Sequence, residues 1–150
     1  MRKTSFIFAL LFASIAGFAQ VKDPVKWTFT SNKLANGSYE VHMTATVEKG
    51  WHIYSQKTPA DGPVPTAFTF ARNPLLAVAD EVKETGKLQT YFEKRFGVDV
   101  KQYSDKVDFV QVVTIKGGAK TSISGSVEYM SCNDKECLPP STKTFSIALK

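Results

Sequence analysis

The sequence predicts an all-β protein with an immunoglobulin-like antiparallel β-sandwich fold, and three observations lead to this prediction. Apolar and polar residues alternate along several segments, which is typical of strands that bury one face. Glycine, proline and asparagine separate these segments at short intervals, where turns are expected. The sequence after residue 19 shows no convincing helical periodicity. Roughly seven or eight short strands joined by turns are typical of such a sandwich.

The clearest strand pattern lies near the start of the predicted domain. A strand is expected over residues 25–30, and Asn36-Gly37 predicts a tight turn after it. Residues 39–47 then alternate strictly between apolar and polar side chains. The face expected to be buried consists of Tyr39, Val41, Met43, Ala45 and Val47. We therefore expect a strand with one side in the core.

The middle of the chain gives a weaker pattern. Aromatic residues predict short strands at residues 51–54 and 67–70, and three prolines predict a loop at residues 59–65. The pattern is weak over residues 73–97, where residues 75–82 are consistent with a short strand or an irregular edge. The aromatic residues in the rest of this stretch are expected in a loop; they are Tyr91, Phe92 and Phe96.

The pattern in the last third of the chain again predicts strands. Residues 107–115 are apolar on both faces, which predicts a central strand, and Gly117-Gly118 predicts a turn after it. Residues 123–129 and 145–149 alternate, so two further strands are expected to flank the segment between them. Both cysteines of the chain lie in that segment.

The N-terminus has the layout of a secretory signal peptide. Arg2 and Lys3 precede an uncharged apolar run over residues 6–18, which is too short to cross a bilayer. Small residues then offer a cleavage site after Ala19. We expect residues 1–19 to be removed and residues 20–150 to form one domain in the periplasm; a retained N-terminal anchor is the alternative.

Charge and hydropathy exclude two classes of partner. The formal charge is +5, and removal of Arg2 and Lys3 leaves 17 basic and 14 acidic residues, a charge of +3. The lysines are spread along the chain rather than clustered, so no nucleic-acid partner is expected. The expected mature chain has no second long apolar run, so no direct membrane insertion is expected.

The two cysteines, Cys132 and Cys137, are separated by four residues. His42 and His52 lack the paired spacing of zinc ligands, and the cysteine spacing is not that of a thioredoxin motif. No metal or cofactor is therefore expected. Two hypotheses remain from the residues alone: a structural disulfide that closes a hairpin, and a pair that exchanges electrons with other thiols.

Physical chemistry weighs on the two hypotheses in different ways. A disulfide that closes a ring of about six residues removes little chain entropy, equivalent to roughly 2 kcal/mol. Thiol–disulfide exchange needs an accessible thiolate and a second cysteine that releases the mixed disulfide. Two cysteines this close in sequence can alternate between dithiol and disulfide with little backbone movement. Spacing alone leaves both hypotheses open.

A family resemblance favours the second hypothesis. Residues 127–140, VEYMSCNDKECLPP, together with residues 142–145 and the aromatic segment at residues 50–55, resemble the N-terminal periplasmic domain of DsbD-type thiol:disulfide interchange proteins. The resemblance implies an immunoglobulin-like fold and a cofactor-free electron shuttle, with a part in cytochrome c maturation. It implies that electrons pass from a membrane thiol reductase to periplasmic thioredoxin-like proteins. By position, Cys132 and Cys137 match the redox pair, with Cys137 forming the mixed disulfide and Cys132 resolving it.

The resemblance also implies residues that line and cap the site. The family covers its disulfide with an aromatic side chain, for which Phe96 is the first candidate and Phe92 the second. His52 and Tyr54 match two site-lining tyrosines, so the histidine is a departure. A second departure is the pair Lys94-Arg95, where family members carry acidic residues. Because the sequence ends at Lys150 without the membrane helices of full-length relatives, the donor is expected to be a separate polypeptide.

The competing hypothesis is a secreted, non-enzymatic binding module with an inert hairpin disulfide. Under this hypothesis Trp51, Tyr54 and Tyr91 are exposed and form an aromatic platform for a ligand. The sequence contains no recognisable arrangement of nucleophile, histidine and carboxylate that would indicate a hydrolase. Exposure of the aromatics and reactivity of the disulfide distinguish the two functions.

Overall fold

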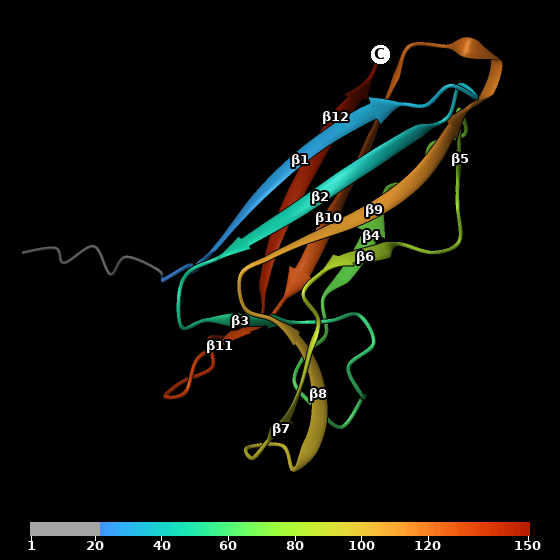
Figure 1. Cartoon of the computed structure of the whole chain (residues 1–150). Coiled ribbons are helices and arrows are strands. Elements are labelled where there is room, and N and C mark those ends of the chain that lie inside the picture. Colours follow the sequence, from blue (N-terminus) through green and yellow to red (C-terminus); the bar gives the residue numbers. More distant parts are fainter. Residues whose placement is uncertain (1–21) are drawn as a thin grey trace, which may run out of the picture.

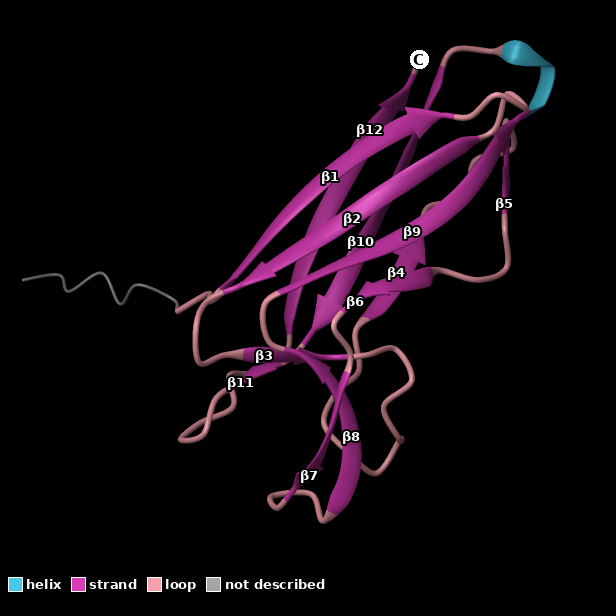
Figure 2. Cartoon of the chain, viewed as in Figure 1, coloured by secondary structure: helices cyan, strands magenta, loops and turns pink. Residues whose placement is uncertain are grey.

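The computed structural model describes residues 22–150, so the expected signal peptide lies outside the described residues. The described chain forms β-strands, one short 3₁₀ helix, η1 (Lys116–Gly118), and no α-helix (Figures 1 and 2). All strand pairs are antiparallel. Residues 22–150 contain no helix with the length and apolarity that a membrane crossing requires. The predicted all-β antiparallel fold is confirmed.

The first sheet has the strand order β1-β2-β9-β5, with β6 also paired to β9. Its strands are β1 (Val25–Lys33), β2 (Tyr39–Val47), β5 (Leu76–Val78), β6 (Lys83–Gly86) and β9 (Lys106–Ile115). The alternating residues of β2 face inward as predicted, and β9 is central as predicted. One face of β9 is fully buried, and its other face is only partly covered. The expected short strand at residues 75–82 corresponds to β5.

The second sheet has the order β12-β10-β4 and packs against the first. Its strands are β4 (Ala67–Phe70), β10 (Thr121–Tyr129) and β12 (Ser141–Leu149). The core between the sheets contains fully buried side chains from both, including Met43, Phe109 and Val127. The Phe109 ring lies 5.0 Å from Phe68 and 5.8 Å from Trp27, centroid to centroid. Apolar burial between two such layers is the main stabilising contribution in a sandwich.

A third sheet, which we call the small sheet, projects from one end of the sandwich (Figure 1). Its order is β11-β3-β8-β7, with strands β3 (His52–Tyr54), β7 (Gln89–Glu93), β8 (Val98–Tyr103) and β11 (Ser131–Cys132). The expectation of a loop around Tyr91 and Phe92 was wrong, because both lie in β7. The strand β7 exposes its first four residues and pairs on one side only, so its sequence carries no period-two burial pattern.

Glu84 attaches the small sheet to the sandwich. Its carboxylate, on β6, accepts hydrogen bonds from the Ser55 hydroxyl at 2.7 Å and from the Gln56 backbone N–H at 2.7 Å. It also accepts one from the Tyr103 hydroxyl of β8 at 2.8 Å. Burial and the neighbouring Glu84 carboxylate raise the pKa of Tyr103, so this phenol remains a donor at physiological pH. The two parts of the molecule are thus joined by a satisfied polar cluster.

Candidate functional site

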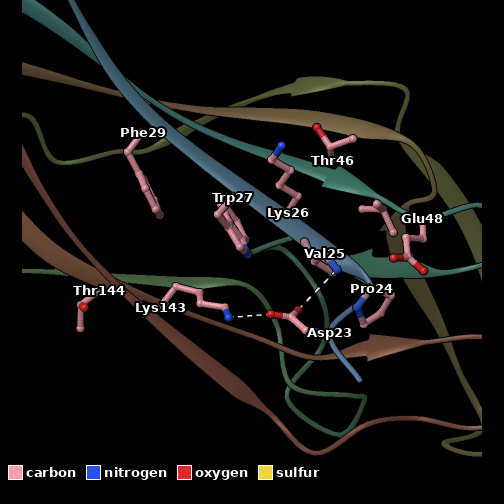
Figure 3. A pocket seen from close by; sticks show the side chains of 11 residues that line it. Asp23, Pro24, Val25, Lys26, Trp27, Phe29, Thr46, Glu48, Lys143 and Thr144 are labelled. Carbon is pink, nitrogen blue, oxygen red and sulfur yellow. Dashed lines mark hydrogen bonds and ion pairs between the residues drawn. The ribbon is translucent and has the colours of Figure 1, made fainter. Parts of the chain in front are cut away.

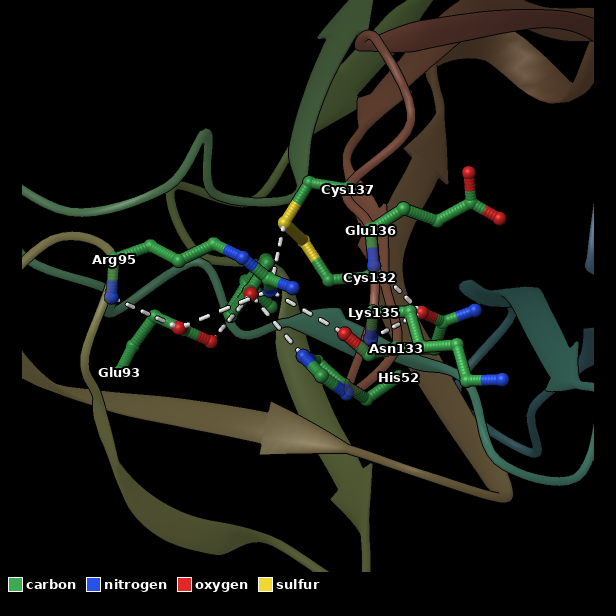
Figure 4. A network of polar contacts seen from close by, with 9 residues as sticks. His52, Glu93, Arg95, Cys132, Asn133, Lys135, Glu136 and Cys137 are labelled. Carbon is green, nitrogen blue, oxygen red and sulfur yellow. Dashed lines mark hydrogen bonds and ion pairs between the residues drawn. A yellow bond between two sulfur atoms is a disulfide. The ribbon is translucent and has the colours of Figure 1, made fainter.

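Cys132 and Cys137 form a disulfide at the edge of the small sheet (Figure 4). Cys132 ends β11, which pairs with β3, and its side chain is fully buried. Cys137 lies opposite Cys132 as an antiparallel bridge and is only half-buried. Cys132 is therefore held inside the sheet, whereas Cys137 is partly exposed to solvent.

The four residues between the cysteines form a turn with its own hydrogen bonds. The Asn133 side-chain oxygen accepts from the backbone N–H groups of Lys135 and Glu136, each at 2.8 Å. The Asn133 backbone N–H donates to the Glu136 carbonyl at 2.8 Å, and the Leu138 N–H donates to the Ser131 carbonyl at 2.9 Å. These contacts do not involve sulfur, so we expect the turn to keep its shape when the disulfide is reduced.

Tyr54 is a buried aromatic residue that packs against Cys132. It is fully buried, and it packs with Val100 and Cys132 in a cluster separate from the sandwich core. Its hydroxyl lies 3.1 Å from His52 Nε2 and donates to Glu93 Oε2 at 3.5 Å. Burial, together with the Glu93 charge, raises the pKa of Tyr54, so the phenol stays protonated. His52 and Tyr54 therefore lie together beside Cys132, and their part in the site stays a prediction.

Burial lowers the pKa of His52, and the positive charge of Arg95 acts in the same direction. The carboxylates of Glu93 and Asp134 oppose this shift. The ordinary pKa of 6.5 is thus reduced, and the imidazole is neutral at pH 7. His42, by contrast, lies on β2 with its Nδ1 2.7 Å from Asp108, so the two histidines belong to different parts of the molecule.

Arg95 connects the buried Glu93 carboxylate to the disulfide. Its Nη1 lies 3.6 Å from Cys137 Sγ and 3.3 Å from the Asn133 carbonyl oxygen, and donates to both. The same nitrogen lies 3.9 Å from Glu93 Oε1, which also accepts from the Arg95 backbone N–H at 3.3 Å. Figure 4 shows the Arg95 side chain reaching from the β7–β8 turn to the sulfur. The sequence marked Arg95 only as a departure from the family, and its contact with sulfur depends on that turn.

The two candidate cap residues lie beside this arginine. Phe96 follows Arg95 in the β7–β8 turn and is 38% exposed, while Phe92 lies on β7 and is 53% exposed. The turn is closed by the backbone N–H groups of Phe96 and Gly97, which donate to the Glu93 carbonyl at 3.1 and 2.8 Å. Neither phenylalanine belongs to the buried cluster around the cysteines. The choice of cap aromatic stays a prediction.

The aromatic platform expected under the binding-module hypothesis does not form as predicted. Trp51 is 6% exposed because it packs into the sandwich core, and Tyr54 is fully buried under the disulfide. Only Tyr91 among the three is exposed, at 52%. The exposed aromatics of the small sheet are instead Tyr91, Phe92 and Phe96.

Two cavities differ in their relation to the disulfide. A cavity of about 310 Å³ lies beside it, lined by His52, Tyr91, Glu93, Lys94, Arg95, Asn133 and Asp134. A larger one, of about 630 Å³, lies between β1 and β12 (Figure 3). Trp27, Phe29 and Lys143 line it, and Lys143 Nζ lies 2.6 Å from Asp23. The two share no lining residue, so only the smaller cavity belongs to the candidate site.

Comparison with solved structures supports the fold. The N-terminal periplasmic domain of ScsB from Proteus mirabilis superimposes with a TM-score of 0.58 at 15% identity, covering 85% of this chain and 47% of that chain. This chain therefore spans about half the length of that structure. The Neisseria meningitidis DsbD N-terminal domain in the reduced form gives a TM-score of 0.51 at 16% identity, covering 80% of this chain and 83% of that chain.

Comparison with protein families gives the assignment. A search of curated protein sequences finds no match. Residues 20–149 match the family described as "Thiol:disulfide interchange protein DsbD, N-terminal". This match covers nearly the whole chain, including both cysteines and the small sheet that holds them. The chain therefore belongs to the DsbD N-terminal domain family.

Proposed function

We propose that this chain is a periplasmic thiol:disulfide interchange domain that passes electrons from a membrane thiol reductase to thioredoxin-like proteins. The observation that carries the proposal is the unequal burial of the disulfide, with Cys132 fully buried and Cys137 half-buried. Exchange requires one sulfur that a partner can reach and a second that closes the ring afterwards. Family membership supports the same chemistry.

The proposed cycle transfers two electrons per turn. In the reduced protein, the Cys137 thiolate attacks a partner disulfide, forms a mixed disulfide and releases one partner thiolate. Cys132 then loses its proton to solvent and attacks Cys137 Sγ, which expels the second partner thiolate. The partner is reduced to a dithiol, and the Cys132–Cys137 disulfide is formed. A dithiol of the membrane reductase returns two electrons by the same steps in reverse.

Export of the protein is part of the proposal. We infer that residues 1–19 act as a cleaved signal peptide, because a basic start, an apolar run and small residues at the end follow in the required order. An oxidising compartment is also where a disulfide persists between cycles. Cell fractionation and N-terminal sequencing of the mature protein should place it in the periplasm with Gln20 as the first residue.

A binding module with an inert disulfide is the second candidate. The observation in its favour is the exposed group on and beside β7, where Tyr91 and Phe92 are more than half exposed. Exposed apolar clusters of this kind commonly contact a ligand or a partner. The same surface lies on the strand that leads into the Arg95 turn, so it also fits a partner that docks at the disulfide.

The decisive experiment combines a reduction potential with two cysteine variants. The pair should equilibrate with glutathione or dithiothreitol buffers at a potential above about −300 mV, whereas structural disulfides lie below that value. Cys132→Ser should trap a mixed disulfide with a thioredoxin-like protein that carries an oxidised Cys-x-x-Cys pair, and Cys137→Ser should not. A lower potential, with no trapped complex for either variant, would establish a structural disulfide.

A further inference from the structure

We propose that Arg95 stabilises the Cys137 thiolate and thereby makes Cys137 the attacking sulfur. The inference rests on the proposed thiol–disulfide exchange and adds the residue that activates it. Arg95 Nη1 donates to Cys137 Sγ at 3.6 Å, which is within hydrogen-bonding distance for sulfur. A guanidinium is protonated at every physiological pH, so this donor always brings a positive charge. Thiolates beside such a charge form more readily than isolated ones.

Two contacts hold the guanidinium in place. The Asn133 carbonyl oxygen, in the cysteine turn, accepts from the same Nη1 at 3.3 Å. Glu93, which is only 6% exposed, lies 3.9 Å from it on the β7 side. A buried carboxylate needs a partner, and Arg95 is the cation closest to it among the described ion pairs. Arg95 is thus fixed between the buried acid and the reachable sulfur.

Among the described contacts of the charged groups around the site, only Arg95 has a hydrogen bond to a cysteine sulfur; Lys94, which lines the same cavity, has none. On β3, His52 is neutral at pH 7 and Tyr54 stays protonated. In the cysteine turn, the Glu136 carboxylate is paired with Lys22 Nζ at 2.7 Å. The Glu93 charge, and that of Asp134 on the cavity wall, oppose a thiolate and reduce the effect of Arg95. Among the described hydrogen bonds, that from Arg95 is the one that reaches a cysteine sulfur.

The charge moves with the bond in the attacking step. The Cys137 thiol releases its proton to solvent, and the resulting thiolate is stabilised by the guanidinium. When this sulfur bonds to a partner sulfur, its negative charge passes to the departing partner thiolate, and Arg95 is left beside a neutral mixed disulfide. The guanidinium therefore favours the reactant thiolate over the thiol but does not hold the sulfur after attack.

Stabilising a thiolate has two opposing effects on the rate at which the thiol reacts. Together they predict a rate change whose direction depends on pH. An opposite charge at this distance shifts thiol ionisation by roughly one pH unit at a partly exposed site. The thiolate fraction at neutral pH then rises about tenfold, while nucleophilicity falls about threefold because reactivity follows basicity with a coefficient near 0.4–0.5. Loss of Arg95 should therefore slow the reaction about threefold at neutral pH and speed it about threefold at high pH.

The test uses the protein with Cys132→Ser, so that Cys137 is the one thiol, and measures iodoacetamide alkylation from pH 5 to 10. Arg95→Gln should move the midpoint of the rate profile upward by roughly one pH unit and make the two profiles cross. Lys101→Gln is the matched control, because it removes the same charge from an exposed position on β8 that does not line the cavity beside the disulfide. Its profile should match that of the parent.

Two results would overturn the inference. Superimposable profiles for Arg95→Gln and Lys101→Gln would show that the guanidinium does not stabilise the thiolate. A rate change of equal size at every pH, without a moved midpoint, would show that Arg95 only shields the sulfur. Neither result needs a partner protein. If the midpoint moves but the protein does not exchange with a thioredoxin-like protein, the effect of Arg95 on thiol ionisation is supported. The proposed function is refuted in that case.

Discussion

The sandwich and the small sheet both bury apolar side chains, but they differ in the charged groups that they bury and the aromatic rings that they expose. In the sandwich the fully buried side chains are almost all apolar, with Val41, Met43 and Phe109 as examples. In the small sheet the carboxylate of Glu93 is buried, while Phe92 is more than half exposed. Burying a charge and exposing an aromatic ring both cost free energy of folding. We therefore expect the sandwich to supply most of the stability of the protein and the small sheet to carry the thiol chemistry proposed above.

If this division is correct, stability and reactivity respond to different substitutions. Changes in the sandwich core should lower the free energy of unfolding and leave the folded protein reactive. Changes in the small sheet should cost little stability and alter the reaction of the cysteines. Four substitutions, given in order of decreasing effect, probe this separation.

Phe109→Ala should have the largest effect. The ring is fully buried between the sheets and lies near the rings of Trp27 and Phe68. Its removal should lower the free energy of unfolding by about 3–5 kcal/mol, measured by urea denaturation. The alkylation rate of the reduced, folded protein should remain that of the wild type. Phe92→Ala, at an exposed position, serves as the control and should cost less than about 0.5 kcal/mol.

Tyr54→Phe should cost about 1 kcal/mol, because it removes the hydroxyl that contacts His52 and Glu93 but keeps the buried ring. A change in thiol reactivity in this variant, with none in Phe109→Ala, would support separate roles for the small sheet and the sandwich. Tyr91→Phe removes an exposed hydroxyl and should be neutral in both assays. A loss of several kcal/mol on Tyr54→Phe would show that the small sheet also carries the fold.

Phe96→Ala tests the predicted cap. If the ring shields the sulfurs, its removal should speed alkylation of the reduced pair by about two- to fivefold, which corresponds to less than about 1 kcal/mol of barrier. Phe92→Ala should then leave the rate unchanged. A faster reaction in Phe92→Ala but not in Phe96→Ala would assign the cap role to Phe92. Equal rates for both variants and the wild type would show that neither ring shields the sulfurs.

His52→Gln should have the smallest effect, visible as a change in pH dependence. The pKa of His52 is lowered in the folded protein, so below pH 6.5 the unfolded chain binds the proton more readily than the folded one. This residue therefore removes stability as the pH falls from 7 to 5, and the variant should lose less over that interval. The free energies of unfolding at pH 5, 7 and 8 measure the slope. An unchanged slope would mean that the imidazole is not buried in its neutral form.

The sequence predicted the sandwich better than the small sheet for a physical reason. The strict alternation at Tyr39–Val47 follows from a strand with one face in the core, and β2 has that environment. The strand β7 exposes its first four residues, so no alternation marks it, and its partner β8 was missed with it. Patterns of burial are readable from sequence only where burial is regular.

The site was predicted in part for a similar reason. Cys132 and Cys137 are close in sequence, and the family resemblance predicted that His52 and Tyr54 line the same site. The link from Glu93 through Arg95 to sulfur was not predictable, because it depends on a turn between two strands that the sequence does not mark. Contacts made by long side chains across a fold leave no periodic signal along the chain.

The pairing of Cys132 with β3 has a consequence for the lifetime of any covalent complex. The strand β11 fixes Cys132 opposite Cys137, so the second thiol of the proposed cycle is already positioned when a partner is attached. Well-oriented groups of this kind reach effective molarities on the order of 10⁵ M, far above any free thiol in solution. A partner should therefore be released long before another thiol can intercept it, which protects the exchange from competing small molecules.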